Sequence, residues 1–306
     1  MKQTLDTTSD TAAAASECFD TVRLALATPA DIEQIEAWAA DDAWQPGHGG
    51  TAMLLSTDPQ GLFVGYIGER PVSAVSVADH GHNLAFFGTL LVDPELRGRG
   101  IGALTWQAAI GRAGDRTLAA DVPTHLTEKA RRLGFTDGFK ILRHVGPLPP
   151  ARGTDPHVIQ LNAEKHSGQL ARLDAACFPA QRPGFATAFA TRTGHHTLVY
   201  ADANGNVRGY GTMNPAPGTA RIGPLYAERS YQAAALFDAL CTLAGNAGAL
   251  TVSMDVPEQS MPGLAIAETR GLSIRSQAHR MYRTGTTELN PVAFDQLCAI
   301  TGVGLG

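Results

Sequence analysis

The chain has 306 residues, of which 44% are hydrophobic and 17% are charged, and its formal net charge is −5. This composition is typical of a globular protein and leaves room for two domains with separate cores. The negative charge argues against nucleic acid or a membrane surface as a partner, and no apolar run reaches the ~18 residues of a membrane span. We therefore expect a cytoplasmic protein.

Residues 1–19 are rich in Thr, Asp, Ser and Ala and lack the apolar segment of a secretory signal, so they predict a disordered N-terminal tail. The four cysteines are far apart in the sequence, and no two of them form a Cys-x-x-Cys pair. The cysteines therefore indicate neither a zinc site nor a disulfide framework. We expect no bound metal.

Residues 20–146 alternate between strand-like and helix-like patterns. Apolar or alternating runs predict strands at residues 22–26, 62–67, 72–77, 85–92, 117–122 and 139–145. Helices are expected from Pro29, with Thr28 as the N-cap, and at residues 101–113 and 127–133. A breaker-rich loop, residues 44–50, separates the first helix from the strands that follow.

A basic, glycine-rich loop connects the strand at residues 85–92 to the helix at residues 101–113. Glycines let an anion approach the backbone closely, and a helix start offers unpaired N–H groups and about half a unit of positive charge. Such a loop is typical of a phosphate-binding site. The residues predicted to form it are Arg97, Gly98, Arg99, Gly100, Ile101, Gly102 and Ala103.

Two other interpretations of this loop remain open. The loop can be a plain helix start that binds nothing, because a lone glycine pattern is a weak signal. Gly98-x-Gly100-x-x-Ala103 also fits a loose dinucleotide-binding fingerprint, with Asp121 about 20 residues further on. Against a dinucleotide site, residues 93–97 separate the strand from the loop, and several strands precede it.

The pattern Arg97-x-x-Gly100-x-Gly102 after a buried strand resembles the acetyl-coenzyme A loop of the GCN5-related N-acetyltransferases (GNATs). The order of elements over residues 22–146 is similar to that family, and residues 44–47, Trp-Gln-Pro-Gly, are similar to the YitH-like and HolE-like tandem acetyltransferases. The resemblance implies acetyl-coenzyme A as a co-substrate. It also implies a backbone N–H near Leu91 or Val92 that polarises the thioester, and an acceptor near Trp44 and His48.

The order of elements repeats after a proline-rich linker at residues 147–156. Two Asp-Val-Pro triplets begin at Asp121 and Asp255, 134 residues apart (255 − 121), and Gly134 and Gly271 are 137 apart (271 − 134). The resemblance then implies an α/β (α+β) protein with two tandem GNAT-like domains, each a mixed twisted sheet flanked by helices. The catalytic domain is residues 20–146, and a degenerate domain is residues 157–306.

The second copy of the loop, residues 227–232, has no glycines, and Glu228 there repels phosphate. We therefore predict one coenzyme A site per chain. The second half is interpreted as a partner that walls the acceptor site, although a purely structural role is the alternative. A short helix is predicted at residues 292–300.

Catalysis of amine acylation needs a base for the amine and a route for the thiolate to leave. Asp121 lies at the end of the strand at residues 117–122, and His125 follows that strand. Both are candidate bases, although a structural role for Asp121 and a surface role for His125 remain alternatives. The family usually has a tyrosine acid four residues before its Gly-Phe pair, and this chain has Ala130 there. A thiol of pKa near 8.5 can leave without that acid.

The pattern and the resemblance together predict an acyl-coenzyme A-dependent N-acyltransferase. It would move an acetyl group to the amine of a small molecule, such as a natural-product amine of the dithiolopyrrolone class. The alternative is an acyl-coenzyme A sensor without catalysis, which Ala130 favours. We expect a monomer or a homodimer.

Overall fold

Strands from both halves of the chain form one continuous sheet. The structure is a computed structural model, and it describes residues 21–41, 50–153, 155–182 and 184–305. The first half contributes β1 (Arg23–Leu26), β2 (Leu62–Ile67), β3 (Arg70–Asp79), β4 (Leu84–Val92), β5 (Thr117–Pro123) and β6 (Thr136–Pro147). The second half contributes β7 (Val158–Gln160), β8 (His196–Ala201), β9 (Val207–Ala216), β10 (Thr219–Ala227), β11 (Thr251–Pro257), β12 (Ser273–Arg283) and β13 (Leu297–Ala299).

Helices flank this sheet in both halves, as the sequence predicts. The first half has α1 (Ile32–Asp41), α2 (Gly50–Thr57), α3 (Ile101–Ala109) and α4 (Thr127–Arg132). The second has α5 (Ala163–Cys177), α6 (Phe185–Ala190), α7 (Ser230–Asn246) and α8 (Met261–Thr269). The predicted fold class is confirmed, with element boundaries that differ by a few residues. None of the described helices has the length and apolar character needed to cross a membrane.

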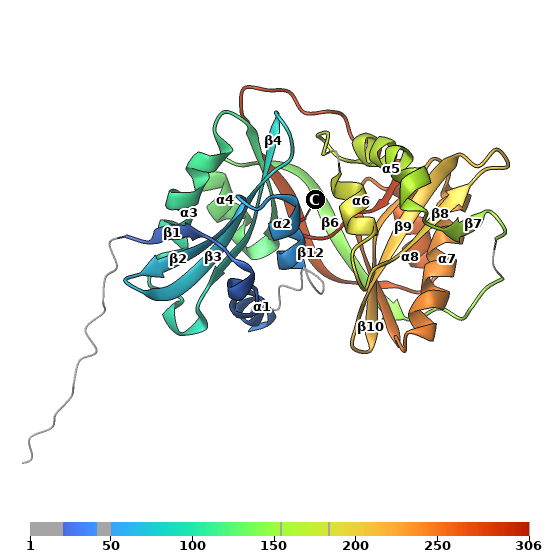
Figure 1. Ribbon diagram of the computed structural model, residues 1–306, viewed down its shortest axis with the longest axis horizontal. Helices are drawn as coiled ribbons and strands as arrows, with labels where there is room; N and C mark the ends of the chain where they lie inside the picture. The colour runs from blue at the N-terminus through green and yellow to red at the C-terminus, as the bar shows by residue number, and fades with distance from the viewer. Residues whose placement is uncertain (1–20, 42–49, 154, 183, 306) are drawn as a thin grey trace, which may run out of the picture.

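The strands β6 and β12 are exchanged between the two halves. The strand order is β1-β2-β3-β4-β5-β12-β6-β11-β10-β9-β8-β7. Thus β12, from the second half, pairs with β5, and β6, from the first half, pairs with β11. The two exchanged strands also pair with each other at the centre of the molecule (Figure 1). The linker at residues 147–156 therefore divides the chain but not the sheet.

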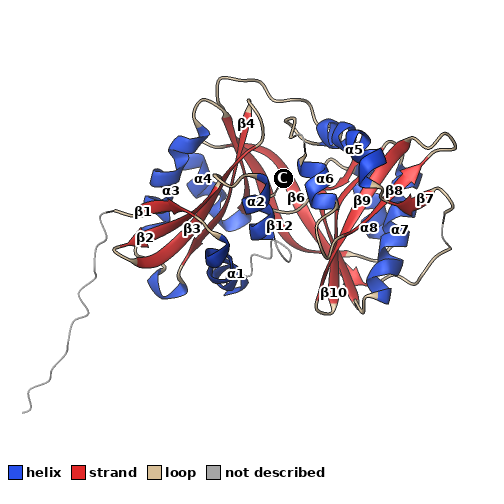
Figure 2. Cartoon of the chain, viewed as in Figure 1, coloured by secondary structure: helices blue, strands red, loops and turns tan. Residues whose placement is uncertain are grey.

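The two faces of the first-half sheet bury separate clusters, because side chains of a strand alternate between its faces. Ala85 and Phe87 of β4 pack with Trp106 of α3, whereas Phe86 packs with Met53 of α2. Ile35 and Trp38 of α1 form a further cluster on β2 and β3 and lie in the stripe that the sequence predicts. The helices thus cover both faces of the sheet (Figure 2).

The second half repeats this two-sided arrangement and packs directly against the first. There α7 and α8 share one cluster, and α5 and α6 share the other. Phe178 and Phe185 join the cluster that holds Met53 and Phe86 of the first half. Burial of apolar side chains from both halves in one cluster stabilises their association.

The prediction of a helix at residues 292–300 is wrong, because residues 294–296 form a turn that leads into β13. It pairs antiparallel with β10, with Leu225 opposite Ala299 and Tyr226 opposite Leu297. Three-residue spacing of apolar side chains fits a helix, but the open backbone edge of β10 offers hydrogen-bond partners that sequence periodicity does not reveal. All three residues of β13 are buried.

Candidate active site

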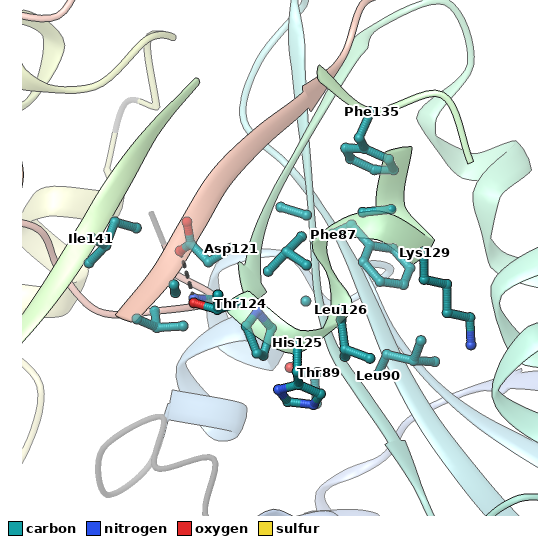
Figure 3. A pocket seen from close by; sticks show the side chains of 18 of the residues that line it. Phe87, Thr89, Leu90, Asp121, Thr124, His125, Leu126, Lys129, Phe135 and Ile141 are labelled. Atoms are coloured by element: carbon teal, nitrogen blue, oxygen red, sulfur yellow. Dashed lines mark hydrogen bonds between the residues drawn. The ribbon is translucent and has the colours of Figure 1, made fainter. Parts of the chain in front are cut away.

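A fork between β4 and β5 forms the candidate active site. The two strands pair in parallel only from Leu84 opposite Thr117 to Phe87 opposite Ala120. Beyond these residues they separate, and a cavity of about 810 Å³ occupies the space between them (Figure 3). Its wall includes residues 88–91 of β4, residues 121–126 at and after the end of β5, parts of α3 and α4, and residues of the second half.

An irregularity in β4 turns the strand backbone toward the cavity. Between Ala74–Leu91 and Ser76–Gly88, β4 has one more residue than β3, which is a β-bulge. Thr89 in this bulge has φ of 49°, a conformation that costs a non-glycine residue about 1–3 kcal/mol. Thr89 is buried, and its hydroxyl accepts a hydrogen bond from Ser76 Oγ at 3.3 Å. The fold therefore holds a strained backbone where the cavity wall begins.

The glycine loop leads from β4 into α3. Gly98 and Gly100 have φ of 79° and 82°, which glycine adopts readily, and Gly100 is the N-cap of α3. The first hydrogen bonds of the helix run from the N–H groups of Ala103 and Leu104 to Gly100 O. The N–H groups before Ala103 come too early in the chain to join the intrahelical hydrogen bonds, as at every helix start. This is the backbone geometry that an anion-binding loop requires.

The predicted donor-binding residues have different places in this geometry. Leu91, Gly102 and Ala103 line the cavity. Ile101 is buried, and its side chain packs with Val22, Val72 and Leu96. The remaining predicted residues lie outside the cavity wall: Val92 is half-buried, and Arg97, Gly98, Arg99 and Gly100 are exposed. Arg97 Nε donates to Val92 O at 3.2 Å, which ties the loop to the end of β4.

Asp121 and His125, the two predicted bases, both line the cavity but differ in their surroundings. The Asp121 carboxylate is fully buried and accepts from Arg280 Nε at 2.5 Å and Nη2 at 3.2 Å. It also accepts from the Gly304 N–H at 2.9 Å (dashed line in Figure 3). His125 is exposed at the cavity wall. Three donors on one carboxylate favour the structural role of Asp121 that the sequence left open.

The second half repeats this ion pair. Asp255 on β11 accepts from Arg143 Nε at 2.7 Å and Nη2 at 3.0 Å, and Arg221 lies at 3.2 Å. Burial raises the pKa of Asp255, but the Arg221 charge and the Arg143 hydrogen bonds outweigh burial and hold the pKa below its usual value. In both halves the arginine comes from the exchanged strand and lies directly opposite its aspartate.

These arginines are not among the predicted site residues, although a signal was present. Arg143 and Arg280 are 137 residues apart (280 − 143), the same offset as Gly134 and Gly271. Lys129, which lines the cavity, is also absent from the predicted site residues. Arg131 beside it is paired with Glu128 and with Asp137.

Two further predictions concern Ala130 and the acceptor loop. Ala130 is buried against Trp106 and Phe135 and lines the cavity. The predicted acceptor residues Trp44 and His48 lie outside the described residues. Within the described part of the chain, no group of three or more His, Cys, Asp or Glu side chains is arranged to hold a metal ion.

Comparison with known proteins relates both halves to one superfamily. Residues 23–135 match the acetyltransferase (GNAT) family, and residues 170–291 match an acetyltransferase (GNAT) domain. Holothin acyltransferase from Pseudoalteromonas sp. (strain SANK 73390) is 25% identical over 258 residues, which are 83% of this chain and 86% of that protein.

Two solved structures of similar fold cover most of the chain. One is a protein from Pyrococcus horikoshii, provisionally described as an acetyltransferase, with a TM-score of 0.76 and 22% identity over 94% of this chain and 97% of that chain. The other is a tandem GNAT protein from the clavulanic acid biosynthesis pathway, with a TM-score of 0.63 and 19% identity over 85% of this chain and 97% of that one.

The chain therefore belongs to the GNAT superfamily, with one GNAT unit in each half. It is a tandem GNAT N-acyltransferase. The forked strands, the bulge and the glycine loop of the first half are the features of the molecule that fit this class.

Proposed function

We propose that the protein transfers an acetyl group from acetyl-coenzyme A to the primary amine of a small molecule, and that this occurs in the first half, residues 20–146. The observation that carries the proposal is the open fork between β4 and β5, with the glycine loop at the start of α3 beside it. The second half, residues 157–306, contributes cavity wall but no second donor site.

The donor fits the first half by its chemistry. The N–H groups at the start of α3 would bind the pyrophosphate, with Gly98 and Gly100 letting it approach closely. The pantetheine arm would follow the cavity wall between β4 and α4, where Leu91, Lys129 and Ala130 lie. The N–H at or next to Leu91 would polarise the thioester carbonyl, and such donors are typically worth a few kcal/mol in the transition state.

The reaction then needs one proton transfer from the amine. The amine nitrogen attacks the thioester carbon, the C–N bond forms, the C–S bond breaks, and coenzyme A leaves as a thiolate of pKa near 8.5. We assign His125 as the group that accepts the amine proton on an imidazole nitrogen, because it is exposed in the cavity. Asp121 already accepts three hydrogen bonds, so we assign it to positioning rather than to proton transfer.

The acceptor is proposed to be an amine with an apolar body. Much of the cavity wall is apolar, including Phe87, Leu126 and Ile141, and a cavity with such a wall selects a largely apolar ligand. The similarity to holothin acyltransferase favours an amine of a dithiolopyrrolone natural product. Trp44 and His48 remain candidates for contact with this acceptor.

The experiment is release of free thiol from acetyl-coenzyme A in the presence of single amines, namely holothin, aniline, benzylamine and tryptamine. Amine-dependent thiol release, with the acetylated amine identified by mass, would support the proposal. Binding of acetyl-coenzyme A without turnover on any amine would favour the sensor that Ala130 suggests. No binding of acetyl-coenzyme A would refute both.

A further inference from the structure

We infer that Val303 selects the acceptor, and that Asp121 and Asp255 hold the C-terminal segment, residues 297–305, which carries it. This inference rests on the proposed function. The segment begins with β13 in the second half. Its later residues reach the cavity of the first half, whose wall includes Val303 and Gly304. Figure 1 shows it at the centre of the molecule, between the two lobes.

Two glycines at corresponding positions in β4 and β10 let this segment pass close to both strands. A Cβ on Gly223 of β10 would lie 2.3 Å from Ile300 O, and a Cβ on Gly88 of β4 would lie 3.0 Å from Gly304 O. The two glycines are 135 residues apart (223 − 88), close to the offset of the two Asp-Val-Pro triplets. Any larger side chain at Gly223 would collide with a backbone carbonyl, so the close approach depends on glycine.

The two aspartates hold the same segment through its backbone. Asp121 accepts from the Gly304 N–H at 2.9 Å, and the Val303 N–H donates to Asp255. The Ile300 N–H donates to Asp255 O at 3.0 Å. Both carboxylates are oriented by arginines of the exchanged strands, so the position of Val303 is fixed from both halves.

Val303 lies in the part of the wall that the second half supplies. That part consists of Asp255, Ser276, Gln277, Ala278, Val303 and Gly304. The donor is assigned to the first-half elements β4, α3 and α4, so the acceptor must meet the thioester from the remaining side. In an apolar site, one methylene changes discrimination by about 10-fold or more, so the size of the Val303 side chain should decide which amine fits.

The test compares Val303→Ala and Val303→Phe with Ile300→Val, a change in the same segment at a buried residue outside the cavity wall. The measured quantity is the ratio of kcat/KM for the widest and the narrowest amine that the unmodified protein accepts. We expect Val303→Ala to raise this ratio and Val303→Phe to lower it by about tenfold, with KM for acetyl-coenzyme A unchanged. Ile300→Val should leave the ratio unchanged.

Asp121→Asn tests the holding role. We expect KM for the amine to rise about tenfold while kcat and the acid side of its pH profile are retained. A kcat loss of about 10²-fold together with loss of that acid-side inflection would instead identify Asp121 as the base.

Failure of this inference can be told apart from failure of the proposed function. Transfer by the unmodified protein with unchanged amine ratios in both Val303 variants, at unchanged thermal midpoints, would overturn the inference alone. If a Val303 variant unfolds, Val303→Ile supplies the same size test with a conservative change. No transfer by the unmodified protein would refute the proposed function, and this inference with it.

Discussion

The two halves form their forks from corresponding strands, but a cavity occupies the first fork and a third strand fills the second. In the first half, β4 and β5 separate after Phe87 and Ala120, and the space beyond is the cavity. In the second half, β10 and β11 pair only as far as Arg221 opposite Ser253, and β13 pairs with β10 beyond that point. A forked parallel pair therefore becomes a ligand site or part of the core depending on whether the chain itself supplies a strand to fill it.

The helix starts beside the two forks, those of α3 and α7, also differ in how their backbone N–H groups are capped. The N-cap of α3 is Gly100, which has no side chain to cap the helix, whereas Arg229 N at the start of α7 donates to Gln232 Oε1 at 3.0 Å. Glu228 is paired with Arg172 and Arg208. At the second helix start, Gln232 thus satisfies the Arg229 N–H, and two arginines neutralise the Glu228 carboxylate beside it. Both the loop and the fork of the second half thus differ from those of the first, as the proposal of a single donor site requires.

Asp255→Asn should produce the largest effect, because Asp255 pairs with Arg143 of the exchanged strand and also holds the C-terminal segment. Removing the charge leaves Arg143 and Arg221 without their carboxylate, and breaking a buried pair in this way costs about 3–5 kcal/mol. We expect the free energy of unfolding at pH 7, measured by urea titration, to fall by that amount. The exposed ion pair of Asp137 with Arg131 gives the control, and Asp137→Asn should cost no more than about 1 kcal/mol.

The pH dependence of this effect has a definite sign. The pKa of Asp255 in the folded protein is lowered, so its stabilising contribution is present above the unfolded value, about 3.9, and is lost as the pH falls through the folded pKa. The difference in unfolding free energy between the unmodified protein and Asp255→Asn should therefore shrink below about pH 4. A difference that grows in acid would contradict the assigned ion pair.

Much of this architecture could be predicted from the sequence, because periodicity and turn residues are local signals. They located the strands of the first half, three of its helices (α1, α3 and α4) and the glycine loop of the first fork. Strand partners are not a local signal, so the exchange of β6 and β12 was missed. The arginines opposite Asp121 and Asp255 were missed for the same reason, and β13 was predicted as a helix because its partner β10 is remote in sequence.

His125→Gln would make the first fork resemble the second at one position. Gln259 follows Asp255 at the spacing by which His125 follows Asp121. If His125 accepts the amine proton, kcat should fall by roughly 10²-fold, and the acid-side inflection of its pH profile should disappear. Affinity for acetyl-coenzyme A, measured by calorimetry, should be unchanged. Retention of kcat within about threefold would remove His125 from the proton transfer.

Gly102→Asp would place a negative charge at the helix start of the first fork. A Cβ at Gly102 would meet only Val92 Cγ2, at 3.5 Å, so the fold should tolerate the change while the carboxylate repels the pyrophosphate. We expect the affinity for acetyl-coenzyme A to fall at least tenfold, or about 1.4 kcal/mol. Gly111→Asp, with no heavy atom within 4 Å of its Cβ, carries the same charge on the same helix region and should change the affinity less.

The same calorimetric titration measures stoichiometry. One coenzyme A should bind per unmodified chain, because the second fork is filled and its helix start is capped. Two equivalent sites per chain would contradict the contrast between the forks.

Ala130→Tyr should have the smallest effect and bears on how the thiolate leaves. Ala130 lines the cavity of the first fork, whereas its counterpart by the 137-residue offset, Ala267, is buried in the core around α7 and α8. A phenol at residue 130 can protonate the departing thiolate, so we expect kcat to rise by up to about tenfold, since the thiolate of pKa near 8.5 already leaves without an acid. The measurement is the rate of thiol release against pH, in which a new inflection near the tyrosine pKa of about 10 should limit the alkaline side. A tenfold or greater loss of kcat in a folded variant that still binds acetyl-coenzyme A would show that the acceptor uses the space beside Ala130, and that the small residue there serves substrate fit rather than the loss of catalysis.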